Sequence, residues 1–216
     1  MKRSERIAKR SFDIVSSTIG LVLFSWIIIL GAFLARLDTG KGFFRQRRVG
    51  RNGKTFNILK LRSMRDGKPG QTNVTTSNDP RISSVGRILR NYKLDELPQL
   101  WNVLIGKMSM VGPRPDVLGF ADKLKGDERI ILTIRPGITG AASYYFRNEE
   151  ELLANQKDPE SYNDHFIWPQ KVKINIDYIK QYSFWYDIKL IFATVTPIFR
   201  KSINKRLVNI LKAYEG

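Results

Sequence analysis

The sequence predicts a mainly helical α+β protein with a membrane-inserted N-terminal helix, a small β-hairpin and a compact helical domain. Three observations support this fold class. Residues 14–35 contain no charged side chain, residues 43–64 alternate apolar and polar side chains around an Asn-Gly pair, and later segments repeat apolar residues at helical intervals. We therefore expect an anchor over residues 1–40, a helical domain over 41–183 and amphipathic helices over 184–216.

The uncharged run over residues 14–35 is long enough to enter a membrane as a helix. Its 22 residues span about 33 Å at ~1.5 Å per residue, and the apolar core of a bilayer is ~30 Å thick. A buried helix of a soluble protein and a cleavable signal peptide are the alternatives. The run is apolar on every face, which is rare in soluble helices. It also exceeds the apolar part of an ordinary signal peptide, and no small-residue cleavage site follows it.

Basic residues flank the run on both sides. Residues 1–10 hold five basic residues and one acid, and residues 41–68 hold ten basic residues and one acid. Because Lys and Arg beside membrane segments favour the cytoplasmic side, we expect both ends to stay there and the segment to be re-entrant, entering one leaflet and returning. A simple crossing is the alternative. The run has no proline to force a kink, and only small residues weaken the helix: Ser16, Ser17, Gly20, Ser25 and Gly31.

The rest of the chain reads as short elements joined by turns. We expect a hairpin around residues 52–53, a polar loop over 66–80, and helices over 81–92 and from 95 onward. A rigid turn at 110–115 follows, then helical structure over 116–134, a turn at 135–140, and helices over 149–183 that break near Trp168-Pro169. In the last helix one face collects Ile203, Leu207, Ile210, Leu211 and Tyr214. This pattern suits a helix lying among lipid headgroups, and also a helix packed on the domain.

Composition narrows the chemistry that this chain can perform. Its formal net charge of +17 predicts an anionic partner, which is nucleic acid, anionic lipid or a phosphorylated substrate. The chain has no Cys, which excludes disulfides, thiolate catalysis and zinc-thiolate sites within it. Its single histidine, His165, excludes a histidine cluster. Catalysis here must use carboxylates, Lys, Arg, Ser or Tyr, with any metal held by oxygen.

An acidic pair, Asp95 and Glu96, stands at the head of an apolar helical pattern in "LDELPQLWNVL". One interpretation is helix capping, because an acid favourably meets the positive end of a helix. The other is a carboxylate nucleophile beside a carboxylate metal ligand. Phosphoryl chemistry suits that pairing, since a divalent cation neutralises a diphosphate while one carboxylate attacks phosphorus. Spacing alone leaves both interpretations open.

Three basic residues are candidates for binding phosphate. Arg114 lies between two prolines, whose rings stiffen the loop, and a positioned guanidinium clamps phosphate with two hydrogen bonds. A surface arginine or a structural ion pair is the alternative. Lys60 and Arg62 stand two apart on a predicted strand, so they share a side, either as phosphate ligands or as a solvated face.

Taken together, these segments resemble the bacterial sugar transferase family, the monotopic phosphoglycosyl transferases, in its short form. The resemblance starts with "KRSFDIVSSTIGLVLFS", continues through "FFRQRRVGRNGKTFNILKLRSM", is most specific in "LDELPQLWNVLIGKMSMVGPRP" and "RPGITG", and ends with "INIDYIKQYSFWYDIKLIFAT". Each motif is weak alone, but their order and spacing together are specific and cover nearly the whole chain.

The resemblance implies a reaction and a set of residue roles. It implies transfer of a sugar 1-phosphate from a UDP-sugar to a polyprenyl phosphate such as undecaprenyl phosphate, with release of UMP, as the first membrane step of surface polysaccharide or glycoconjugate synthesis. Asp95 would form an aspartyl phosphosugar, and Glu96 would help to hold Mg²⁺. Arg114 matches the arginine of the Pro-Arg-Pro turn, and Arg147 falls where the family has an arginine linked to sugar-nucleotide binding. The catalytic domain is then expected at the cytoplasmic face of the bacterial inner membrane, in contact with membrane lipids.

Two positions depart from the family pattern. Many members have Ser-Pro in the middle of the membrane segment, where this chain has Ser25-Trp26, so the re-entrant topology rests on the basic flanks. Many members also have Asp where this chain has Lys107.

Two other classes of function also fit the charge. A membrane-tethered nucleic-acid-binding protein would show a basic stripe interleaved with exposed aromatic residues, whereas the basic residues here flank lipid-seeking segments, so we expect no nucleic-acid partner. A non-catalytic scaffold of a glycan assembly complex would not need an intact Asp95-Glu96 pair. The sequence identifies neither the sugar, nor the glycan, nor the oligomeric state.

Overall fold

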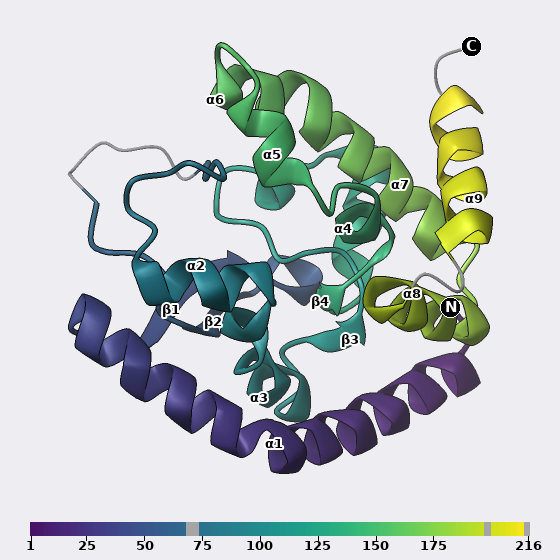
Figure 1. Ribbon diagram of the computed structural model, residues 1–216. Helices are drawn as coiled ribbons and strands as arrows, with labels where there is room; N and C mark the ends of the chain where they lie inside the picture. Colours follow the sequence, from purple (N-terminus) through teal and green to yellow (C-terminus); the bar gives the residue numbers. More distant parts are fainter. Residues whose placement is uncertain (68–73, 197–199, 214–216) are drawn as a thin grey trace.

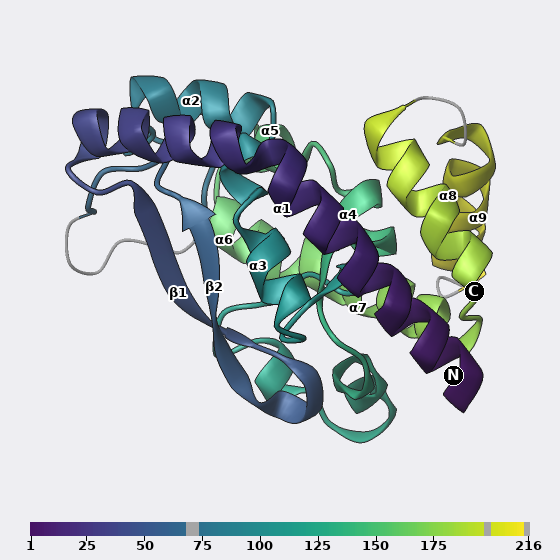
Figure 2. The same ribbon diagram turned by 90° about the horizontal axis from the view of Figure 1, so that it is seen from below.

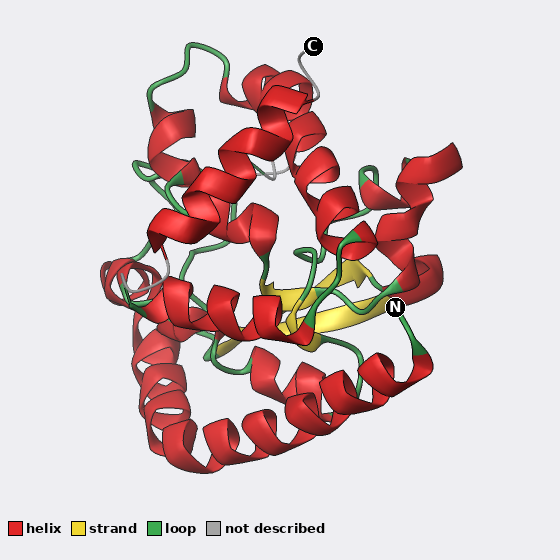
Figure 3. Ribbon diagram, turned by 90° about the vertical axis from the view of Figure 1, so that its right-hand side faces the viewer, coloured by secondary structure: helices red, strands yellow, loops and turns green. Residues whose placement is uncertain are grey.

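The computed structural model describes residues 1–67, 74–196 and 200–213 and has the predicted mainly helical α+β fold. The longer helices of the described residues are α1 (Arg3–Thr39), α2 (Ser84–Asn91), a 3-10 segment (Gly126–Thr133), α7 (Trp168–Lys180), α8 (Phe184–Val195) and α9 (Arg200–Ala213). The strands are β1 (Phe43–Val49), β2 (Thr55–Leu61), β3 (Ser109–Val111) and β4 (Gly137–Thr139). Shorter helices are α3 (Gln99–Leu104), α4 (Ala141–Tyr145), α5 (Glu149–Ala154) and α6 (Pro159–Tyr162). The β3–β4 pair lies among the helices, whereas the β1–β2 hairpin lies at the edge of the molecule, beside α1, with β1 largely exposed (Figures 2 and 3).

Helix α1 runs along one side of the molecule and is bent, but not broken, near its middle (Figures 1 and 2). The hydroxyl groups of Ser16 and Ser25 donate to the carbonyl oxygens of Phe12, at 2.6 Å, and of Val22, at 2.9 Å. Such hydroxyl-to-carbonyl bonds within a helix are associated with bending. The helix therefore curves along the domain without a proline.

The two faces of α1 are the reverse of those in a soluble amphipathic helix. The face packed on the domain consists of small or polar residues, namely Lys9, Asp13, Ser17, Gly20, Gly31 and Ala35. At Gly31 an added Cβ would lie 2.6 Å from the side chain of Leu61, so glycine permits the close approach. The large apolar side chains point outward, and Trp26 is 63% exposed. A soluble protein has no reason to expose such a surface, whereas lipid would cover it.

The hairpin is confirmed. Strands β1 and β2 pair antiparallel from Phe43 opposite Leu61 to Val49 opposite Thr55, and Asn52 in the connection has a φ of 58°. Asn tolerates this left-handed conformation better than most residues, which explains the strength of the Asn-Gly signal.

The segment at 135–140 differs from the prediction of a turn. Residues Gly137–Thr139 form β4, which pairs in parallel with β3, so the two predicted turns lie side by side. An added Cβ at Gly140 would lie 2.1 Å from the carbonyl oxygen of Gly112, and one at Gly112 would lie 2.5 Å from that of Arg135. Only glycine allows this contact between the two backbones.

Two further segments differ in detail. The helical structure predicted over 116–134 is of the 3-10 type. The break predicted near Trp168-Pro169 appears as a change of helix type, because a π-helical turn at Asn163–Ile167 ends there and α7 begins at Trp168, with Pro169 in its first turn. A first-turn proline removes no helical hydrogen bond that the chain needs.

The C-terminal segment forms the two predicted helices, α8 and α9. Ile203, Leu207 and Leu211 of α9 are buried in the main core, so its apolar face packs on the domain, as the alternative interpretation held. Tyr214, which the sequence places on the same face, lies outside the described residues. On α8, Trp185 stays 72% exposed and faces away from the core.

Candidate active site

The acidic pair lies in a short 3-10 turn, Leu94–Glu96, between α2 and α3. Lys93, just before it, has a φ of 56°, a conformation that a lysine rarely adopts. Helix α3 starts after Pro98, and no side chain caps either this helix or the turn. Asp95 and Glu96 therefore make no capping hydrogen bond, although both stand in the first turn of the 3-10 segment.

Glu96 is held between two cations that come from distant parts of the chain. Its Oε1 atom accepts hydrogen bonds from Lys60 Nζ at 2.8 Å and from Arg114 at 2.7 Å. Burial favours the neutral acid, but Arg114 and Lys60 outweigh it and hold the pKa of Glu96 well below its usual range. Glu96 is therefore ionised at neutral pH.

Asp95 differs sharply from its neighbour. Its side chain is buried, and no group in the described part of the chain donates a hydrogen bond to it. Burial raises the pKa of Asp95, Lys60 partly offsets that rise, and the charge of Glu96 adds to it. A desolvated carboxylate without donors is a strong nucleophile once it is ionised.

Arg114 is positioned by the paired strands β3 and β4. The amide of Gly112 donates to the carbonyl oxygen of Thr139 at 2.9 Å, and that of Gly137 donates to the carbonyl oxygen of Pro113 at 2.8 Å. These bonds fix the backbone on the N-terminal side of Arg114. Its side chain stays 44% exposed while it binds Glu96, and that carboxylate raises its pKa above the usual value. The side chain is thus only partly enclosed while it binds Glu96.

A second set of charges surrounds Arg114, and the sequence interpretation missed it. Glu149 Oε1 accepts from Lys171 Nζ at 2.7 Å, and the Glu149 charge raises the pKa of Arg114. Burial raises the pKa of Asp116 to about 7, while Lys171 and Arg48 partly counter this effect. The sequence could have indicated that Asp116 lies near Arg114, since Asp116 directly follows the Pro-Arg-Pro motif. Nothing in the sequence linked Glu149, Lys171 or Arg48 to the pair.

The remaining predicted residues lie apart from the acidic pair. Arg62 follows β2 and points to Asp66 and to the carbonyl oxygen of Met64, the latter at 3.0 Å. Arg147 is exposed, with its guanidinium 5.2 Å from the centroid of the Tyr144 ring. Of the six predicted site residues, the structure brings together Asp95, Glu96, Lys60 and Arg114.

The oxygen atoms present fit a magnesium ion only if the substrate shares in binding it. Among the described residues no three metal-ligating side chains form a group. Glu96 Oε1 is occupied by two cations, which leaves Glu96 Oε2 and the Asp95 oxygens. Mg²⁺ typically takes one or two carboxylates together with substrate phosphates and water, and this donor set has that form.

Helix α1 is long and apolar enough to cross a membrane, judged by length and composition alone. It is the one helix of this kind in the described residues, and 11% of its most apolar stretch is buried inside the protein.

Comparison with known proteins places the chain among sugar transferases. A family model described as bacterial sugar transferase matches residues 4–201. The chain is 36% identical to the UDP-glucose:undecaprenyl-phosphate glucose-1-phosphate transferase of Escherichia coli, over 93% of the chain and 41% of that protein. It is 34% identical to the undecaprenyl-phosphate galactose phosphotransferase of Salmonella typhimurium, over 93% of the chain and 42% of that protein. It is 31% identical to the exopolysaccharide production protein ExoY of Rhizobium meliloti, over 89% of the chain and 85% of that protein.

The chain thus spans less than half the length of the first two of these relatives. Their shared region includes nearly all of this chain, and the family match runs from α1 to the start of α9. The chain belongs to the bacterial sugar transferase family.

Proposed function

We propose that this chain transfers a sugar 1-phosphate from a UDP-sugar to undecaprenyl phosphate and so initiates the synthesis of a surface polysaccharide. The observation that supports it most is the contrast within the acidic pair. Asp95 is buried and finds no donor among the described residues, whereas Glu96 is held by Lys60 and Arg114. This arrangement provides a nucleophile beside groups that bind phosphate. The names of the relatives supply the substrates.

The proposed reaction consists of two successive nucleophilic substitutions at one phosphorus atom. First, an Asp95 oxygen bonds to the β-phosphorus of the UDP-sugar, and the bridging bond to the α-phosphate oxygen breaks, so UMP leaves with that oxygen. Next, an oxygen of undecaprenyl phosphate bonds to the same phosphorus, and the bond to Asp95 breaks. Asp95 returns as a carboxylate, and the product is a polyprenyl diphosphate sugar.

The other residues bind and orient the substrate. Arg114, whose side chain is partly exposed, would bind a phosphate oxygen, and Lys60 would keep Glu96 in place. A bound Mg²⁺, shared by Glu96 and the diphosphate, would supply charge neutralisation. Arg62 and Arg147 are the remaining candidates for phosphate or sugar-nucleotide binding.

Helix α1 supplies a reason for the reaction to take place at a membrane. One substrate is too apolar to leave the bilayer, and the other is too charged to enter it, so their phosphates must meet at the interface. The outward apolar face of α1 and the exposed Trp185 of α8 would contact lipid. We propose that α1 is re-entrant, with the domain on the cytoplasmic face, since both of its flanks are basic.

The decisive experiment measures UMP release with Mg²⁺, undecaprenyl phosphate and a panel of UDP-sugars. We expect release with at least one donor, no release by Asp95→Asn, and normal release by the control Asp127→Asn, which changes an exposed acid. Chelation of divalent cations should stop release, and added Mg²⁺ should restore it. Intact-protein mass after donor alone should show a phosphosugar adduct on the parent. An active parent without an adduct would rule out the covalent route.

The topology has its own test, because the chain has no native cysteine. Cysteines in Ser4→Cys and Lys54→Cys variants, both at exposed positions, should react only with a reagent on the cytoplasmic side. Labelling of the two positions from opposite sides would show that α1 crosses the membrane.

A further inference from the structure

An aromatic pocket of about 590 Å³ lies on the domain between the α4–α5 connection, α6, the start of α7 and α9. Its volume falls within the range of small-molecule sites. Its lining includes Phe146, Tyr162 and Phe166 as aromatic residues, and Asn148 and Gln170 as amides. The rings of Tyr162 and Phe166 lie 4.8 Å apart between centroids and are tilted by 31°. Together they offer a broad aromatic surface, and Phe166 is 46% exposed.

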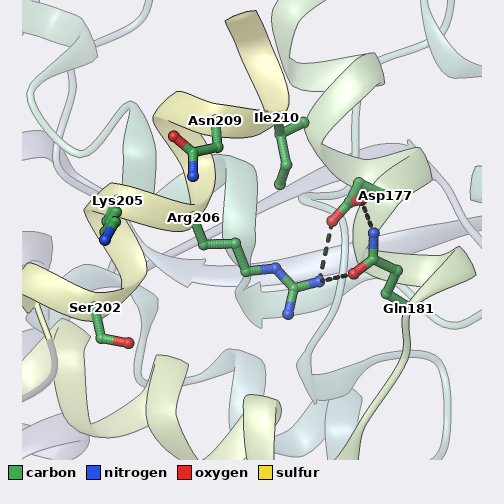
Figure 4. A pocket seen from close by; sticks show the side chains of 7 residues that line it. All are labelled: Asp177, Gln181, Ser202, Lys205, Arg206, Asn209 and Ile210. Atoms are coloured by element: carbon green, nitrogen blue, oxygen red, sulfur yellow. Dashed lines mark hydrogen bonds and ion pairs between the residues drawn. The ribbon is translucent and has the colours of Figure 1, made fainter. Parts of the chain in front are cut away.

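The wall formed by α9 is fixed to α7. Arg206 donates to Asp177 at 3.0 Å and to Gln181 at 3.3 Å, as Figure 4 shows for the neighbouring polar pocket. The same guanidinium lies 4.1 Å from the centroid of the Tyr186 ring. Val208 and Leu211 of α9, which line the aromatic pocket, are therefore held in place by a neighbouring ion pair.

Glu149 connects this pocket to the acidic pair. It lines the pocket, and it binds Lys171 at 2.7 Å. Its charge also acts on Arg114, which in turn binds Glu96 at 2.7 Å. Through Glu149 the pocket therefore adjoins Lys171, one of the cations that would hold a diphosphate. A ligand whose diphosphate lies over Arg114 and Lys171 would place its next group in the pocket.

The lining favours a flat polar ring over a lipid chain. Aromatic side chains stack on the face of a nucleobase, and an amide offers both a donor and an acceptor to its edge. Neither Asn148 nor Gln170 makes a side-chain hydrogen bond within the described residues, so both amides are available. Figure 1 shows α5 and α6 on the side of the domain away from α1, where a water-soluble ligand would enter. A polyprenyl chain would instead approach from the side of α1.

We propose that this pocket binds the uracil and ribose of the UDP-sugar, with Tyr162 and Phe166 as the stacking surface and Asn148 and Gln170 as the groups that recognise the base edge. The proposal rests on the proposed function, because that function supplies the uridine nucleotide. It places the two halves of the donor on either side of Glu149: the nucleoside among aromatic residues and the sugar phosphate at Asp95.

The test measures the binding of UMP to the full-length protein in lipid nanodiscs by equilibrium dialysis, without turnover. We expect Phe166→Ala and Gln170→Leu to weaken UMP binding by about tenfold or more, as loss of base stacking does. The control Trp185→Ala removes an exposed aromatic side chain from α8, outside the pocket, and should leave UMP binding unchanged. Inorganic pyrophosphate, used as a competitor, should bind equally well to the parent and to Phe166→Ala. Thermal unfolding checks that each variant is folded.

The outcomes separate this proposal from the proposed function. Unchanged UMP binding in both folded pocket variants, with an active parent, overturns the pocket and leaves the transferase intact. UMP binding that depends on Phe166 in a parent that releases no UMP supports the pocket and overturns the transferase. A rise in the KM for undecaprenyl phosphate alone, with the KM for the UDP-sugar unchanged, shows a lipid site and overturns the proposal.

Discussion

Two clusters of buried charges in this protein have opposite characters. The first, which we call the α1 clamp, consists of Lys9, Asp13, Tyr178 and Asp187. There, Asp187 accepts from Lys9 and from Tyr178, the latter at 2.6 Å. Asp13 Oδ1 accepts from Ser109 Oγ and from the amide of Met110, both at 2.9 Å. Each carboxylate of the clamp is supplied with donors by the protein itself.

The second cluster is the acidic pair with Lys60 and Arg114. Glu96 is satisfied in the same way as the acids of the clamp, but Asp95 finds no donor among the described residues. A fully bonded buried acid holds two elements together, whereas an unbonded one lowers stability unless it has another role. The clamp is therefore structural, and the lack of a protein donor to Asp95 among the described residues supports its proposed role as the nucleophile.

The largest effect expected is that of Asp95→Asn. Asparagine has nearly the same shape but is no nucleophile, so turnover should fall by ~10⁴-fold or more. Because burial raises the pKa of Asp95, removal of its charge should leave the free energy of unfolding equal or higher. UMP release and urea unfolding measure the two quantities. A variant that loses both activity and stability would place Asp95 with the clamp residues.

Next in size is Asp187→Asn, which leaves Lys9 buried without its ion-pair partner. Breaking a buried pair on one side costs about 3–5 kcal/mol. We expect urea unfolding at a clearly lower midpoint, with turnover per folded molecule retained. The control Asp177→Asn breaks the less buried pair with Arg206, which should cost about 1 kcal/mol or less. If the two variants lost the same free energy of unfolding, the special structural role of the α1 clamp would be contradicted.

A smaller loss of activity is expected from Arg114→Ala. Removal of one preorganised donor typically slows turnover by ~10²- to 10³-fold, and Arg114→Lys should recover part of it, since lysine keeps the charge but not the planar fork. Arg147→Ala is the matched comparison. Because Arg147 contacts Tyr144 and not the acidic pair, we expect its replacement to slow turnover less than Arg114→Ala does. A larger loss from Arg147→Ala would extend the site to that residue.

The last prediction concerns stability and not activity, and it is a pH dependence that comes from Asp116. Its pKa is raised from 3.8 to about 7, so the folded state binds more protons than the unfolded state between these values. Stability should therefore fall as pH rises from about 4 to about 7, and Asp116→Asn should flatten this slope. Urea midpoints across the pH range measure it. Glu96 acts in the opposite direction. Its pKa is lower in the folded than in the unfolded state, so its contribution to stability is present above the ordinary pKa of a glutamate and is lost as the pH falls below that value. A parent profile without a decline towards pH 7 would contradict the assignment.

Local patterns predicted local structure well. The Asn52-Gly53 hairpin, helix α2 and the long apolar helix were all predictable, because each depends on residues close together in the chain. The pairing of β3 with β4 was not, since two short glycine-containing segments carry no signal of which partner they choose. The role of Gly20 and Gly31 was also misjudged. They were expected to weaken α1, and the structure shows that they let it approach the domain.

The sequence by itself determined the class of chemistry. It excluded thiolate and histidine-cluster chemistry within the chain, it provided an acidic pair before a Pro-Arg-Pro turn, and its motifs matched one family. The tertiary structure alone decided that Lys60 and Arg114, which stand 36 and 18 residues from Glu96, bind that carboxylate, while no group in the described ranges donates to Asp95. The reason is physical. The type of a side chain sets what it can do, but its pKa and its free hydrogen-bonding capacity depend on neighbours that only packing brings together.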